Sequence, residues 1–415
     1  MCEDGARLDP SGTVGNGTRA MRRPLLVAVL LAALAPRAGG QEIEAQILQA
    51  LDVVADAVER SFARALPLPA PSAGVAYSFD PATGNFQRDP STYGQVYLER
   101  AEPLRHGQIN VSMAYQYVSL DELEGHDAGN LRTRSPVPIP GLLAALEFPT
   151  LAVTADVQQV LFAGSYGVTD DLEASIAVPV VYSHITLDAP IRGAAITPLG
   201  NLVLFDERYS TAQNSTGVGD VMLRGKYRFA DFTNGRLAAG LLLRLPSGDE
   251  EQLQGIGFVE VTPSLIASTR VYERASWARL QGHFNGAIAF DTEDVGASEA
   301  RWGFGLDWGF TDQLTAGVAI LAQNQFQRVA PEGSFTLPRC QSDLVTCAAD
   351  PSVRVGEQQL YGLAGDRPDY YSLSIGGRGA LWRDTIFAFA NVSIPLNDGF
   401  VRTDPVPLVG LEATF

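Results

Sequence analysis

Hydrophobic and polar residues alternate with a period of two in about twelve segments of this chain, starting near residue 107. The pattern is clear where Leu172, Ile176 and Val180 share one face and Glu173 lies on the other. Successive side chains of a strand point to opposite faces, so the pattern predicts strands. The predicted strands lie near 107–118, 151–167, 172–185, 217–229, 236–246, 257–270, 276–290, 300–310, 314–326, 369–381, 385–395 and 405–415.

The connections between these strands alternate between long and short. Thr169–Asp171 and Thr311–Gln313 are tight, whereas 119–150, 186–216 and 327–368 are long. Short periplasmic turns and long external loops are typical of an outer-membrane barrel with both termini in the periplasm. The sequence therefore predicts an all-β protein, an antiparallel up-and-down transmembrane β-barrel of about 12 strands over 107–415.

The chemistry of the two strand faces distinguishes a membrane barrel from a soluble one, which is the alternative. Aromatic residues such as Tyr227, Trp302 and Phe310 end strands on the apolar face, as in the girdles of membrane barrels. The opposite face carries charges that a dry core would not hold cheaply. Candidate pore-lining residues on that face are Asp220, Arg224, Lys226, Arg228, Arg244, Glu260, Arg279, His283, Arg301, Asp307 and Arg378.

The chain before the barrel divides into four parts. Residues 1–20 are a probable misassigned start or extension, and 21–40 have the layout of a signal peptide cleaved near Gly40–Gln41. Apolar residues at helical spacing predict a helix over 41–66, which packs on its own domain or plugs the barrel. Residues 67–106 are rich in Pro, Gly, Asp and Ser and predict a linker.

Composition excludes several classes of function. The 415-residue chain has a net charge of −17, which argues against a nucleic-acid partner. Cys340 and Cys347 share one long loop, and an exported protein favours a disulfide there over a metal site, which would need more ligands. No cofactor fingerprint or metal-ligand spacing occurs, and the four histidines are scattered. We expect no metal, no cofactor and no enzyme activity.

Two segments carry a resemblance to a known family. Thr216–Phe229 (TGVGDVMLRGKYRF) and Leu245–Glu251 (LPSGDEE) resemble the motif pair of the phenol-degradation meta-pathway family. The resemblance implies an outer-membrane barrel, often called a transporter, and says little about its substrate. Its specific part is these two motifs.

We therefore expect an outer-membrane channel or transporter for small molecules, with aromatic or other hydrophobic compounds as candidates. The alternative is a non-transporting structural or partner-binding barrel. The last strand ends on Phe415, which resembles the C-terminal signal that outer-membrane proteins present to their assembly machinery. The expected partners are thus outer-membrane lipid, that machinery and an unknown small solute. Whether the lumen is open or closed by ion pairs between its charged residues stays undecided at this point.

Overall fold

The computed structural model describes the barrel and most of its connections. The described residues are 77–80, 85–88, 96–123, 126–130, 137–138, 143–147, 149–150, 152–197, 199–275, 278–311, 313–326, 336–340, 342–350, 354–359, 369–382, 385–398 and 401–415. The predicted signal peptide and the predicted helix 41–66 lie outside them. None of the described helices is long and apolar enough to span a membrane.

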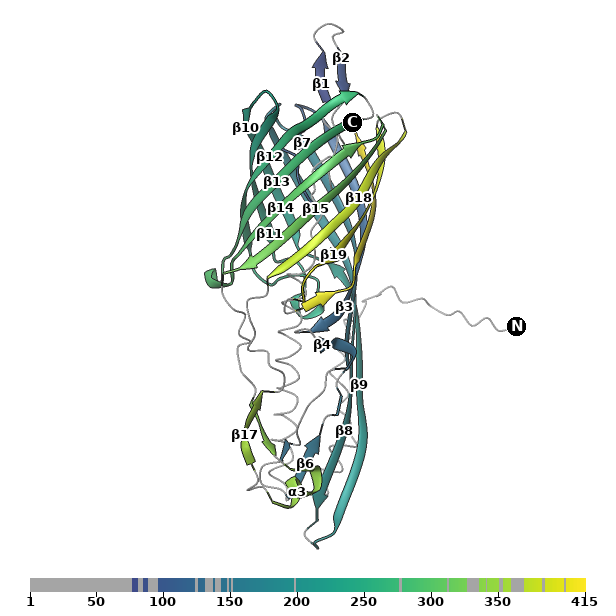
Figure 1. Cartoon of the computed structure of the whole chain (residues 1–415), viewed down its shortest axis with the longest axis vertical. Coiled ribbons are helices and arrows are strands. Elements are labelled where there is room, and N and C mark those ends of the chain that lie inside the picture. The colour runs from purple at the N-terminus through teal and green to yellow at the C-terminus, as the bar shows by residue number, and fades with distance from the viewer. Residues whose placement is uncertain are drawn as a thin grey trace, which may run out of the picture.

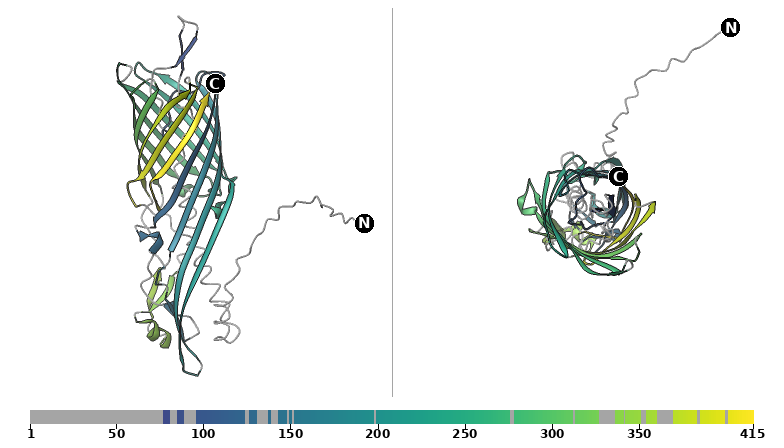
Figure 2. Two further views of the ribbon diagram at one scale, coloured as in Figure 1. Left: turned by 90° about the vertical axis from the view of Figure 1, so that its right-hand side faces the viewer. Right: turned by 90° about the horizontal axis from the view of Figure 1, so that it is seen from above.

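Twelve antiparallel strands close into a barrel within the described part of the chain (Figure 1), which confirms the predicted fold. Each strand pairs with its neighbour in sequence, and β21 pairs with β3 to close the ring, which Figure 2 shows end on. The barrel strands are β3 (Ile109–Leu123), β7 (Ala152–Gly167), β8 (Leu172–Ile196), β9 and β10 (Leu202–Val218 and Val221–Asp231), β11 (Gly235–Leu245), β12 (Glu260–Ala275), β13 (Ala278–Asp291), β14 (Glu299–Gly309), β15 (Leu314–Gln325), β18 (Tyr370–Trp382), β19 (Ile386–Pro395) and β21 (Val406–Thr414). Strands β9 and β10 follow one another along β8 and count as one strand of the twelve.

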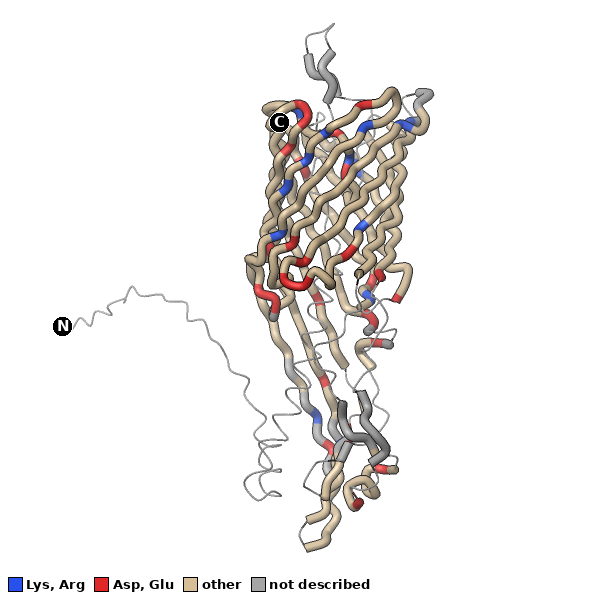
Figure 3. The backbone as a smooth tube through the Cα atoms, turned by 90° about the vertical axis from the view of Figure 1, so that its left-hand side faces the viewer, with Lys and Arg blue, Asp and Glu red and all other residues tan. Residues whose placement is uncertain are grey.

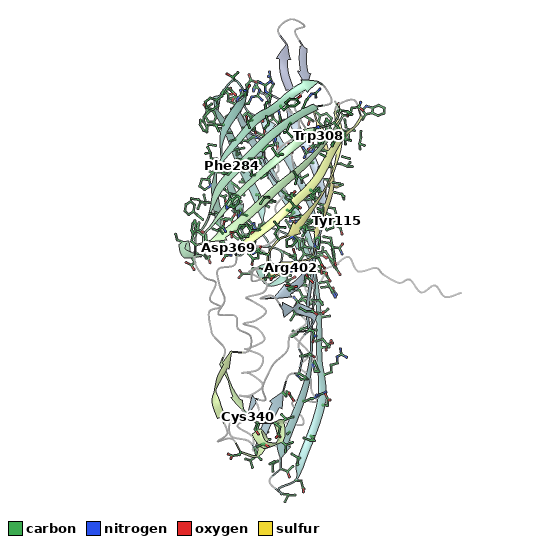
Figure 4. The ribbon with its side chains drawn as sticks, viewed as in Figure 1. Tyr115, Phe284, Trp308, Cys340, Asp369 and Arg402 are labelled. Atoms are coloured by element: carbon green, nitrogen blue, oxygen red, sulfur yellow. A yellow bond between two sulfur atoms is a disulfide. The ribbon has the colours of Figure 1, made fainter. Side chains whose placement is uncertain are left out.

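Alternation of side chains gives the barrel an apolar outer face. Phe304 is 52% exposed and Leu241 46% exposed, and both lie in the middle of strands. Their sequence neighbours on the other face are buried or half-buried. A barrel is one of the few folds that can expose such a surface in lipid, because all its backbone groups pair between strands. Figure 4 labels Tyr115, Phe284 and Trp308 on this wall.

Strands β8 and β9 continue far beyond the barrel, and this corrects one prediction. The predicted loop 186–216 is a regular hairpin, in which Ile196 pairs with Leu202 at the tip and Val180 with Val218 at the base. The sequence predicted this stretch as a long connection, but cross-strand ion pairs such as Arg192–Asp206 and Arg208–Asp188 join the two strands. The hairpin forms the long extension at the bottom of Figure 1.

Shorter elements cover the extension and both ends of the barrel. Helix α3 contacts β6 and β8, and a disulfide joins Cys340 to Cys347 beside Ala145 and Ala194. The remaining elements are β1 (Tyr77–Asp80), β2 (Asn85–Arg88), β4 (His126–Asp127), η1 (Ala128–Asn130), β5 (Val137–Pro138), β6 (Ala144–Glu147), η2 (Glu250–Gln252), η3 (Val295–Ala297), β16 (Thr336–Cys340), α3 (Leu344–Ala349), β17 (Arg354–Gln359) and β20 (Val401–Thr403).

Candidate channel interior

The charged residues predicted to line the pore lie on the inner face of the barrel wall. Lys226, His283 and Asp307 are almost completely buried, whereas Arg228 and Arg301 keep more exposure at the two ends of the barrel. Charged positions of both signs recur along the barrel strands in Figure 3. The structure therefore brings these residues together around one lumen.

Ion pairs join most of these side chains, so the lumen does not carry a row of free cations. Arg224 pairs with Glu99, and Arg228 with Asp171. Further pairs are Lys226 Nζ to Glu173 Oε2 at 3.3 Å, Arg244 Nε to Asp220 Oδ2 at 2.9 Å, Arg301 Nη2 to Glu260 Oε2 at 2.7 Å and Arg378 Nη1 to Glu412 Oε1 at 3.5 Å. Arg279 is also buried in this wall. These contacts are those expected of a lumen closed by ion pairs.

Residues 96–106, which we call the lumen segment, run inside the barrel although the sequence predicts a linker there. Ala101 is fully buried, and its amide donates to Ser268 Oγ at 2.9 Å. The amide of Leu104 donates to Glu173 Oε2 at 2.7 Å. The segment forms neither helix nor strand, so side chains of the wall bind its backbone directly.

Two carboxylates attach the lumen segment to the arginines of the wall. Glu99 pairs with Arg224 from β10, and its amide also donates to Asn285 Oδ1 at 2.7 Å. Glu102 Oε1 lies 2.6 Å from Arg236 Nη1. Because the side chains of Glu99 and Arg224 are largely buried, removing one of them would leave the charge of the other without compensation.

An apolar layer crosses the lumen at the end of the lumen segment. Val96 and Tyr97 pack there against inward-facing side chains from opposite walls. These side chains are Ala114, Leu161, Ala163, Ala177, Met222, Phe389 and Leu408, with Leu242 and Leu321 beside them. The inner face is therefore not polar throughout, because its middle is an apolar collar that the segment fills.

A cavity of about 250 Å³ lies beside this layer. Tyr97 and Leu98 of the lumen segment line it on one side, and Tyr370, Asn397 and Arg402 line it near the end with the long connections. Ala238 and Ile266 pack on Ala101 further along the segment. The cavity is thus free space inside the lumen, next to the lumen segment.

The two segments of the family resemblance contact each other at the mouth of the barrel from which the long connections extend. The Asp220 carboxylate accepts hydrogen bonds from Arg244 Nε and from the amides of Gly248 (3.1 Å) and Ile256 (2.8 Å). Ser247 Oγ donates to the Gly219 carbonyl at 2.8 Å. A Cβ on Gly248 would lie 2.3 Å from the carbonyl oxygen of Gln254, so only glycine fits there. These contacts hold the connection between β11 and β12 over the mouth.

The same connection helps to close the mouth. Leu253 is buried against Val401 of β20 and Val118 of β3, although its φ of 58° is unusual for a residue other than glycine. Nearby, burial and the carboxylates of Asp121 and Asp156 raise the pKa of Asp404 above its usual value. The connection between β11 and β12, through Leu253, thus narrows the lumen at its mouth, and the lumen segment fills it further inside.

His283 contacts Ser268 and Asp307 in a chain across three strands, in which the contact between His283 and Ser268 is a hydrogen bond. His283 Nδ1 lies 3.0 Å from Ser268 Oγ, and its Nε2 lies 3.0 Å from Asp307 Oδ2. A serine, a histidine and a carboxylate in this order can activate a nucleophile. Here all three are buried, none lines the cavity, and Ser268 Oγ accepts from the Ala101 amide. The chain therefore serves to anchor the lumen segment.

Comparison with known proteins gives similarity in fold alone. No family profile and no curated protein sequence matches this chain. An outer membrane channel from Pseudomonas putida F1 is similar over 77% of this chain and 100% of its own, at 10% identity and a TM-score of 0.45. The CymD monoaromatic hydrocarbon channel is similar over 75% of this chain and 89% of its own, at 9% identity and a TM-score of 0.34. The KdgM porin is similar over 74% of this chain and 99% of its own, at 9% identity and a TM-score of 0.33.

The closed barrel with its apolar outer face places this protein in the bacterial outer membrane. The expectation that the protein has no enzyme activity stays a prediction. The resemblance to the phenol-degradation family stays a prediction.

Sequence reasoning missed the lumen segment and Ser268. The sequence signal for burial of the lumen segment was its large apolar residues, which an exposed linker seldom contains. These are Tyr97, Leu98 and Leu104. No comparable signal pointed to Ser268. Its place opposite His283 follows from the register of β12 and β13.

Proposed function

We propose that this protein is a gated channel for small molecules across the outer membrane. The observation that carries the proposal is the lumen segment, which fills the barrel without becoming part of its wall. Its contacts are single hydrogen bonds and ion pairs to side chains, not a strand ladder. Such a segment can leave the lumen while all twelve strands stay paired, and that movement would open a path.

The interior also favours a class of solute. The wall residues of the apolar collar that packs on Val96 and Tyr97 would line the path once the segment has moved. Charged solutes lose hydration in such a collar, whereas aromatic and other hydrophobic compounds lose little. We therefore propose small hydrophobic or aromatic molecules as the solutes.

A cross-link between the lumen segment and the wall tests the gate. Ala101 and Ala238 belong to one buried cluster, so Ala101→Cys combined with Ala238→Cys should form a disulfide. In planar bilayers, we expect the oxidised double variant to stay closed and its openings to return after reduction. Ala101→Cys alone, given the same reductant, controls for reduction of Cys340–Cys347. Equal conductance of the oxidised and reduced double variant would refute the gate.

The second candidate function is a partner-binding barrel, and the external hairpin of β8 and β9 favours it. This hairpin extends well beyond the membrane strands, and β6 pairs with the other edge of β8 near the hairpin tip. Removing residues 187–213 should abolish such binding and leave conductance intact. A loss of conductance on this removal would count against the hairpin as a separate binding element.

We also propose that β21 presents the assembly signal. Phe415, which follows β21 directly, is 71% exposed, and its backbone pairs with Ile109 where the barrel closes. Phe415→Ala should lower the amount of folded barrel in the outer membrane, measured by heat-modifiable migration, but leave refolding in detergent unchanged.

A further inference from the structure

The cavity next to the lumen segment contains a buried hydroxyl that has no partner. Tyr97 lines the cavity and is 9% exposed, yet its hydroxyl makes no hydrogen bond among the described residues. Asn285, which lines the same cavity, has a partner, because its Nδ2 donates to the Glu99 carbonyl. A buried polar group without a partner costs free energy, so it points to a ligand that would supply one.

The charges around the cavity argue against a charged ligand. Four arginines line it, and each already faces a carboxylate. The pairs are Arg224–Glu99, Arg244–Asp220, Arg301–Glu260 and Arg402–Asp398. An anion would have to displace one of these carboxylates, and a cation would meet the guanidinium groups. The cavity is therefore suited to an uncharged molecule.

Size and wall chemistry narrow the class further. Leu98, Leu242, Ile266, Leu321 and Val406 give much of the lining an apolar character. An apolar cavity of roughly 150 Å³ is enough to hold benzene, and drug-sized ligands occupy roughly 300–1,000 Å³. A cavity of about 250 Å³ thus fits one ring with a small substituent.

We propose that this cavity binds a small, uncharged, mostly apolar molecule that has one hydrogen-bonding group, and that Tyr97 recognises this group. The proposal rests on the proposed channel function, since it names the solute class of the same lumen. Tyr97 belongs to the lumen segment, so the bound molecule contacts the gate itself. The ligand would then meet the segment from the external side of the lumen.

Three probes of similar size test the chemistry: benzyl alcohol, toluene and benzoate. We suggest equilibrium dialysis of each radiolabelled probe against the barrel in lipid nanodiscs, with empty nanodiscs to subtract partition into lipid. The barrel should bind benzyl alcohol most tightly, toluene less tightly and benzoate least. Benzoate as the tightest ligand, or no binding above empty nanodiscs, would overturn the proposal.

Two variants and a control assign the binding to this cavity. Tyr97→Phe should weaken benzyl alcohol binding about three- to tenfold, the effect of one hydrogen bond, and leave toluene unchanged. Tyr115→Phe is the matched control, because Tyr115 faces outward and its hydroxyl donates to Gln158. Ala287→Leu fills part of the cavity and should weaken both probes. Equal binding by Tyr97→Phe and the wild type would overturn the role of Tyr97.

Bilayer recordings of the same preparations separate the two proposals. Openings without benzyl alcohol binding would overturn the ligand site and leave the gated channel in place. Binding of benzyl alcohol without any opening, both in the wild type and in the reduced double variant Ala101→Cys with Ala238→Cys, would overturn the channel function and leave the ligand site in place.

Discussion

Replacing Glu99 by glutamine removes the negative charge that fastens the lumen segment to Arg224 and keeps the shape of the side chain. Both side chains are largely buried in the closed barrel. Glu99→Gln therefore leaves the Arg224 charge without its partner as long as the segment stays in place. Once the segment leaves the lumen, water can solvate Arg224. The substitution should thus destabilise the closed state more than the open one.

The magnitude follows from the burial of the pair. Removing one partner of a buried ion pair costs about 3–5 kcal/mol. We expect the lower end, about 3 kcal/mol, because Glu99 and Arg224 border the cavity. A shift of this size raises the ratio of open to closed channels about 150-fold. In the double variant Glu99→Gln with Arg224→Gln no buried charge is left unpaired, so the increase should be much smaller.

Single-channel recording in planar bilayers measures this ratio directly. The control is Arg208→Gln, which breaks a pair with Asp188 in the hairpin of β8 and β9, outside the barrel. It should leave the open fraction unchanged. If Glu99→Gln and the control opened equally often, or if the double variant opened as often as Glu99→Gln, the ion pair would not hold the gate.

Three further predictions address the lipid face, the extension and the mouth. Leu241→Arg places a charge on the lipid face and should lower the free energy of unfolding in vesicles by about 2–4 kcal/mol, whereas Leu199→Arg, at the exposed hairpin tip, should change it little. Replacing Cys340 and Cys347 by serine should make the extension sensitive to protease and leave barrel stability unchanged, as limited proteolysis and unfolding would show. Asp220→Ala removes the acceptor of three hydrogen bonds, so hydrogen exchange in 247–256 should rise, and unchanged exchange would contradict its role at the mouth.

The sequence alone determined the membrane barrel. Alternation over segments such as 300–310 reflects a wall only one residue thick, in which each side chain meets either lipid or lumen. The inward position of Arg244 and the outward position of Leu241 therefore followed directly from the count of residues along β11. Short turns that alternate with long connections fixed the up-and-down order.

The content of the lumen depended on contacts between residues far apart in the chain. The alternation of residues in β10 predicts that Arg224 faces the lumen. Its partner Glu99 lies 125 residues earlier in the chain, in a segment without hydrophobic periodicity. The length of the external hairpin was likewise hidden, because the sequence predicted strands that end near 185 and begin near 217, and the pairing of β8 with β9 between these positions is visible only in the structure. A local pattern records which side of the wall a residue faces. It does not record which distant segment fills the space inside, and only the tertiary structure decided that.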